Sequence, residues 1–105
     1  MKKLLMITTT AMALGLAVGA QAQDAAKLAQ DKVCMACHQL DKKLVGPAYK
    51  EVAKKYAATK GADVTLAKKI REGGTGVWGQ IPMPPNAGVN EKEAQILVKW
   101  ILSQK

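Results

Sequence analysis

Four stretches of this 105-residue chain repeat apolar positions at the three- and four-residue spacing of amphipathic helices. They begin at residues 25, 49, 63 and 90; the first leads into Cys34, the second is expected to stop near residues 59–61, and the last two run to residues 72 and 101. The positions on this spacing are Ala25, Leu28, Ala29, Lys32 and Val33, then Tyr49, Val52, Ala53 and Tyr56, then Leu66, Ala67 and Ile70, and finally Ala94, Leu97, Val98 and Ile101, widened by Ile96 and Trp100. No useful stretch alternates between apolar and polar residues. The sequence therefore predicts an all-α fold of about four helices, with strands absent or trivial.

Capping signals mark two of these helices. Asp63 is expected to cap the start of the third helix, which should end at Gly73-Gly74. Asn90 and Glu93 have the spacing of a capping box, in which each side chain binds the backbone N–H of the other residue. These residues predict where the third and fourth helices begin.

The segment between these helices, residues 73–89, is rich in glycine and proline. An irregular segment of this length is unusual in a small domain, and long loops are commonly functional. Proline fixes φ and reduces the freedom of the chain, so we expect a stiff loop. Met83 lies in its middle, between Pro82 and Pro84.

The first 22 residues have the features of a secretory signal peptide. Two lysines follow Met1, residues 4–20 are an uncharged apolar run, and Ala20-Gln21-Ala22 offers small residues where a signal peptidase reads the chain. We expect cleavage after Ala22, export to the periplasm, and one mature domain of residues 23–105 without stable membrane insertion. The alternative is a retained anchor, for which this apolar run is at the short limit.

The charge is strongly basic, with 16 Lys and Arg against eight Asp and Glu. Loss of Lys2 and Lys3 with the signal would leave 14 basic residues and a net charge of +6. A basic surface suits nucleic acid, anionic lipid or an acidic protein. For an exported protein we expect no nucleic-acid partner and favour an acidic redox partner, although the charge could also simply solvate the surface.

Both cysteines and the only histidine occur together in Cys34-Met35-Ala36-Cys37-His38. C-x-x-C-H is the attachment sequence of a c-type haem, in which two thiols bond to the porphyrin and the histidine ligates the iron. The mature chain has only four aromatic residues and no Phe, which is few for a protein core. A buried haem would add a large apolar surface to that core. The chain without haem is therefore expected to fold poorly.

Other uses of the two cysteines remain open at this point. They could form a structural disulfide, a redox-active dithiol or half of a zinc site. A closed zinc site needs four protein ligands, and this segment offers three unless a carboxylate joins them. A thiol–disulfide oxidoreductase of the thioredoxin type needs its dithiol in a βαβ unit, which the pattern does not predict.

Met83 is the candidate for the second iron ligand by elimination. Low-spin electron-transfer haems commonly take Met or His, and His38 has no second histidine to pair with. Three methionines belong to the signal peptide, and Met35 lies between the two cysteines. Met83 could instead be a gap-filling apolar residue. With both axial positions filled, the iron would suit electron transfer, whereas a labile Met83 would suit a haem sensor or a peroxidase-like protein.

Beyond the C-M-A-C-H segment, the chain contains V-G-P-A-Y at 45–49, G-V-W-G-Q-I-P-M-P-P-N at 76–86 and a closing A-Q-I-L-V-K-W-I-L-S-Q-K. With these motifs, the whole mature chain resembles the small bacterial class I cytochromes c of the cytochrome c-551/c-552 family. The resemblance implies a helical shell around one haem c, with the first and last helices crossing. It makes Cys34 and Cys37 the thioether residues and His38 and Met83 the axial ligands.

The resemblance also implies a set of residues around the haem. The Pro47 carbonyl would accept a hydrogen bond from His38, although Gly46-Pro47 could be an ordinary turn. Asn86 would lie near the Met83 sulfur. The Trp78 indole N–H and the Lys69 ammonium would approach a haem propionate, although Trp78 could simply pack.

These expectations define a function. The chain is expected to be an exported, monomeric, single-haem electron carrier, not an enzyme, that moves one electron between a membrane-bound donor complex and a soluble reductase or oxidase. Its redox partners would carry acidic docking patches. The lysines that could form the docking face, or merely solvate two helices, are Lys42, Lys43, Lys50, Lys54 and Lys55.

Overall fold

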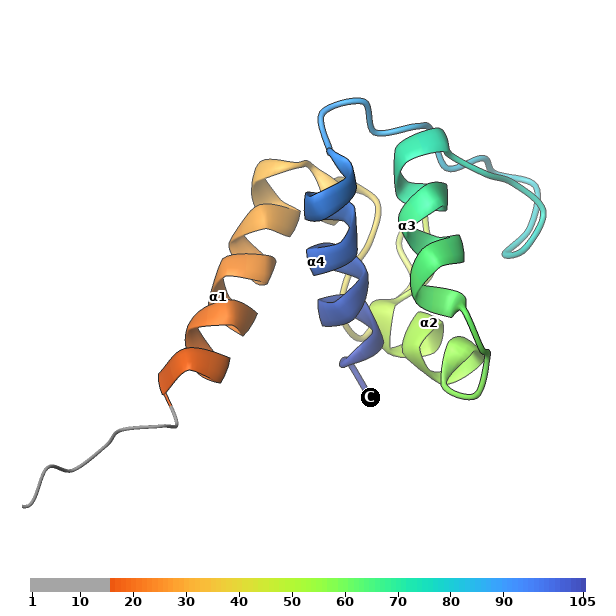
Figure 1. Cartoon of the computed structure of the whole chain (residues 1–105). Coiled ribbons are helices and arrows are strands. Elements are labelled where there is room, and N and C mark those ends of the chain that lie inside the picture. Colours follow the sequence, from red (N-terminus) through yellow and green to blue (C-terminus); the bar gives the residue numbers. More distant parts are fainter. Residues whose placement is uncertain (1–15) are drawn as a thin grey trace, which may run out of the picture.

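The computed structural model describes residues 16–105 and consists of helices joined by irregular segments (Figure 1). The elements are α1 (Leu16–Asp31), the short 3₁₀ helix η1 (Cys34–Ala36), α2 (Tyr49–Tyr56), α3 (Ala62–Glu72) and α4 (Glu91–Leu102). Within these residues, the only β-type pairing is an isolated antiparallel bridge between Gly74 and Met83. The predicted all-α fold is confirmed.

Helix α4 is the centre of the domain, in contact with α1, α2 and α3, and it lies between α1 and α3 in Figure 1. Its residues Leu97 and Val98 are fully buried. Each such side chain contributes roughly 1.5–3 kcal/mol through removal of its apolar surface from water. Trp100 packs against the same core cluster, in an edge-to-face contact with Tyr49 at 5.6 Å between ring centroids. Ile96, expected to widen this apolar face, is instead 40% exposed.

Helix α1 differs from the sequence prediction at both ends. It begins at Leu16, and so passes through Ala22, after which we expect cleavage; residues 1–15 of the expected signal peptide lie outside the described residues. At the other end, Val33 has a left-handed backbone with φ of 64° and is 68% exposed. Val33 therefore ends the helical run and turns the chain into η1, and it is not part of the buried face.

The other predicted helix ends are confirmed in part. The capping box is present, since Glu93 N donates to Asn90 Oδ1 at 2.8 Å and Asn90 N donates to Glu93 Oε1 at 3.1 Å. The prediction that Asp63 caps α3 is wrong. Gly61, with φ of 77°, occupies the N-cap position, and Asp63 lies in the first turn, where its charge suits the helix dipole.

The Gly73–Val89 segment leaves α3, arches over one end of the domain and returns to α4 (Figure 1). Gly73 ends α3 with φ of 79°, and a Cβ atom there would lie 2.6 Å from the Met83 carbonyl oxygen. Glycine is therefore required where the two arms of the loop meet. Over residues 16–105, no helix is both long enough and apolar enough to cross a membrane.

Candidate haem site

The C-x-x-C-H segment forms one tight turn directly after α1. Cys37 N and His38 N both donate to the Cys34 carbonyl oxygen, at 3.2 and 3.0 Å. The turn therefore holds the two cysteines close together with the histidine immediately behind them. Both thiols are free and half-buried, whereas His38 is only 9% exposed. Burial raises the pKa of the Cys34 thiol, which keeps it protonated in the chain without haem.

The imidazole of His38 is held by the V-G-P-A-Y segment. Its Nδ1 lies 2.8 Å from the Pro47 carbonyl oxygen, which can only accept, so Nδ1 carries the proton and, in the neutral tautomer, Nε2 has the free lone pair. Gly46 N donates to the Cys37 carbonyl oxygen at 2.7 Å. A Cβ atom on Gly46 would lie 2.5 Å from His38 Cε1, so the backbone lies directly against the ring. This contact makes Gly46 more than a turn residue.

Tyr49, placed by its spacing on the buried face of α2, also reaches this histidine. Its ring stacks on the imidazole with 4.8 Å between centroids and 18° between planes. Burial raises the pKa of Tyr49, and the neighbouring Cys34, with which its hydroxyl interacts, raises it further. Helical periodicity could identify Tyr49 as a core residue but gave no signal for its contact with His38.

Met83 is held by the backbone of the loop. Met83 N donates to the Gly74 carbonyl oxygen at 2.7 Å, and Gly74 N donates back to the Met83 carbonyl oxygen at 3.0 Å. These two bonds join the middle of the loop to the end of α3. The Met83 side chain is half-buried and packs against the core cluster. A thioether is thus presented from a fixed backbone position.

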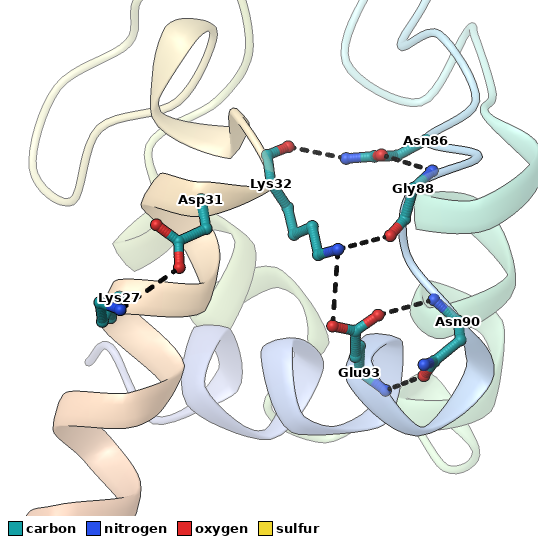
Figure 2. Close-up of polar contacts among 7 residues, drawn as sticks. All are labelled: Lys27, Asp31, Lys32, Asn86, Gly88, Asn90 and Glu93. Atoms are coloured by element: carbon teal, nitrogen blue, oxygen red, sulfur yellow. Dashed lines mark hydrogen bonds and ion pairs between the residues drawn. The ribbon is translucent and has the colours of Figure 1, made fainter.

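Asn86, expected near the Met83 sulfur, has described hydrogen bonds to other groups. Its Nδ2 donates to the Lys32 carbonyl oxygen at 2.8 Å, and its Oδ1 accepts from Gly88 N at 3.2 Å. The side chain of Lys32 contacts the same part of the molecule. Its Nζ donates to the Gly88 carbonyl oxygen at 2.7 Å and lies 3.6 Å from Glu93 Oε2. Figure 2 shows this Lys32 clasp, which joins the end of α1 to the loop and to the cap of α4. The helical spacing indicates only a helix-face position for Lys32.

The remaining expected residues lie on the loop, on α2 and α3, and in the segment before α2. Trp78 is 41% exposed, with the Lys55 ammonium 5.5 Å from its ring centroid. Lys69 is half-buried, and its side chain runs beside the backbone of Gly74, next to the bridge that holds Met83. Of the lysines considered for docking, Lys50 pairs with Asp41 at 2.7 Å and Lys54 with Glu51 at 3.7 Å, while Lys42 and Lys43 are exposed.

The donor set suits a covalently attached haem. Two free thiols lie one turn apart, and a buried imidazole beside them has one nitrogen fixed by a carbonyl and the other available. A thioether is presented from a separate segment of fixed backbone. Thioether formation requires free thiols, and ligation requires an unprotonated imidazole nitrogen. The residues present therefore fit the group that the C-x-x-C-H sequence implies.

Comparison with known proteins also indicates a haem c protein. The family model for cytochrome c matches residues 22–105. Among curated proteins, the chain is 52% identical to cytochrome c-551 of Pseudomonas aeruginosa over 105 residues, covering all of both chains. It is 50% identical to cytochrome c-552 of Nitrosomonas europaea, covering 91% of this chain and 93% of that protein.

The structural comparison agrees. The crystal structure of wild-type Nitrosomonas europaea cytochrome c552 matches with a TM-score of 0.75 and 52% identity, covering 76% of this chain and 99% of that one. The predicted family and the predicted haem c are thereby confirmed, and the zinc and dithiol alternatives are set aside. The chain belongs to the cytochrome c family, with one covalently bound haem c as its cofactor.

Proposed function

We propose that this protein is an exported single-haem electron carrier of the periplasm, with its iron held by His38 and Met83. The observation that carries the proposal is the state of His38, which is buried and bound through Nδ1 to Pro47, so that Nε2 is available to the metal. In the proposal Cys34 and Cys37 are the thioether residues. The haem supplies one-electron chemistry through the Fe(II)/Fe(III) couple.

The two axial residues set the character of the site. The Pro47 carbonyl fixes the tautomer of His38 and makes the imidazole a stronger donor. The neutral thioether of Met83 favours Fe(II) and raises the reduction potential. Two protein ligands leave no open position for a substrate, which is why the proposal is a carrier and not an enzyme.

The proposal also covers processing and partners. Cleavage after Ala22 would leave residues 23–31 as the first helix of the mature protein. We propose that the mature chain is monomeric and passes an electron from a membrane-bound donor complex to a soluble reductase or oxidase. The excess of basic residues supports partners with acidic docking patches, because complementary charge speeds encounter. The exposed Lys42 and Lys43, which form no described ion pair, are suited to such contacts.

The experiment is a comparison of Met83→Ala with Met35→Ala in the holoprotein. Both methionines are half-buried and pack against the core cluster, so both variants lose similar packing. Only Met83→Ala should open the iron, seen as carbon monoxide binding to the reduced protein and loss of the far-red sulfur-to-iron band when oxidised. Equal indifference to carbon monoxide in both variants would contradict Met83 ligation. Rapid carbon monoxide binding by the unaltered protein would favour the sensor or peroxidase-like alternative.

A further inference from the structure

The His38 imidazole is confined on three sides. The Pro47 carbonyl binds its Nδ1 edge, the Gly46 backbone lies against it, and Tyr49 stacks on it nearly in parallel. A hydrogen bond to a carbonyl tolerates a broad range of angles and so permits the ring to tilt. A stacked aromatic ring restricts that tilt, because tilting would break the face-to-face contact.

Tyr49 is itself fixed in place. Its side chain is buried, with 4% exposure, and Trp100 of α4 meets it edge-to-face at 5.6 Å and 77°. Its backbone N–H donates to the Gln39 carbonyl oxygen at 2.9 Å, which joins the start of α2 to the residue after His38. Cys34 packs against the core cluster that contains Tyr49. One side chain therefore connects the helix packing to two of the residues that hold the haem.

We propose that Tyr49 is a positioning residue that sets the plane of the His38 imidazole, and through it the electronic asymmetry of the haem. This inference rests on the proposed function, in which His38 ligates the iron. The plane of an axial imidazole, together with the lone-pair orientation of a thioether ligand, sets which iron orbital carries the unpaired electron of a low-spin ferric haem. That orbital distributes unpaired spin over the porphyrin and so sets the order and spread of the haem methyl proton shifts.

The test compares Tyr49→Leu and Tyr49→Phe with the control variant Tyr56→Leu in the oxidised holoprotein. Tyr56 lies at the other end of α2, is half-buried and packs against the same core cluster. Tyr49→Leu removes the stacked ring and is expected to change the spread of the haem methyl shifts and the anisotropy of the electron paramagnetic resonance signal. Tyr49→Phe keeps the ring and should retain both signatures, as should Tyr56→Leu despite its lost packing.

Two results would overturn the inference. If Tyr49→Leu keeps the haem methyl shifts and only lowers the unfolding midpoint, Tyr49 acts as a core residue alone and does not set the imidazole plane. An equal change in Tyr49→Phe would assign the effect to the hydroxyl and not to the ring. If Tyr49→Leu yields no holoprotein, Tyr49→Met replaces it with the same expectation, because a flexible thioether fills irregular space better. Failure of the proposed function would appear separately, as the absence of a low-spin His/Met spectrum in the unaltered protein.

Discussion

Replacement of Lys32 by methionine tests whether the Lys32 clasp holds the domain together. Methionine keeps much of the aliphatic stem and removes the ammonium group. The change eliminates the 2.7 Å bond to the Gly88 carbonyl and the 3.6 Å ion pair with Glu93. The Glu93 carboxylate also belongs to the capping box of α4, so the loss affects the junction of α1, the loop and α4 (Figure 2).

The structure sets the size of the effect. The side chains of Lys32 and Glu93 are 27% and 26% exposed, so water screens their interaction only in part. A hydrogen bond from a charged donor contributes about 1.5–3 kcal/mol, and a partly exposed ion pair adds up to about 1 kcal/mol. With the remaining exposure taken into account, we expect Lys32→Met to lower the free energy of unfolding by about 2 kcal/mol. For a domain of this size that corresponds to a fall in Tm of about 8–16 °C.

The control is Lys27→Met, which removes the same charge from within α1, just before the residue that carries the clasp. Lys27 pairs with Asp31 at 3.8 Å, but these side chains are 76% and 59% exposed (Figure 2). An exposed pair of this kind contributes about 0.3–0.5 kcal/mol. Guanidinium unfolding of the two holoproteins should separate them by more than 1 kcal/mol at similar m-values. Equal midpoints would refute the reasoning, because they would show that the Lys32 clasp is worth no more than a surface pair.

Three further changes test other parts of the structure. Gly46→Ala places a methyl group against the His38 ring and should cost about 1–3 kcal/mol on thermal unfolding, whereas Gly88→Ala, whose Cβ meets only an ordinary contact, should be nearly neutral. Asn90→Ala should lower the free energy of unfolding by about 1 kcal/mol through loss of the capping box. Asn90→Asp, which can still cap the helix, should keep most of that free energy. Replacement of both cysteines by alanine should abolish cooperative unfolding followed by circular dichroism, since a domain this small is expected to depend on the haem to complete its core; a sharp transition would contradict this.

Periodicity located all four helices because each buries an apolar face against its neighbours. It placed the start of α2 correctly, although α2 ends at Tyr56 and not near residues 59–61 as expected, and the capping box marked the start of α4. The errors lie where backbone conformation overrides pattern. Val33 fits the apolar spacing yet takes a left-handed conformation, and Gly61 supplies a positive φ at a position where a carboxylate cap at Asp63 was expected.

Sequence alone could predict the part of the candidate site whose residues are neighbours along the chain. Cys34, Cys37 and His38 are adjacent in sequence, and one spacing identifies them. The contacts that fix their geometry come from outside this segment; the family resemblance indicated the bond of His38 to Pro47, but residue spacing did not predict these contacts. The Lys32 clasp spans more than 50 residues, and Asn86 uses its amide there, which the family resemblance did not indicate. The contact of Tyr49 with His38 likewise depends on the fold and not on a motif.

The most direct measurement of the central claim is the visible spectrum of the exported protein, oxidised and reduced, with carbon monoxide added to the reduced form. The account predicts sharp c-type bands, a weak far-red sulfur-to-iron(III) band and no response to carbon monoxide, as expected for His38 and Met83 on the iron. Bands that shift with carbon monoxide would mean an open axial position and would contradict the carrier proposal. A colourless protein from a host able to attach haem would contradict the site itself.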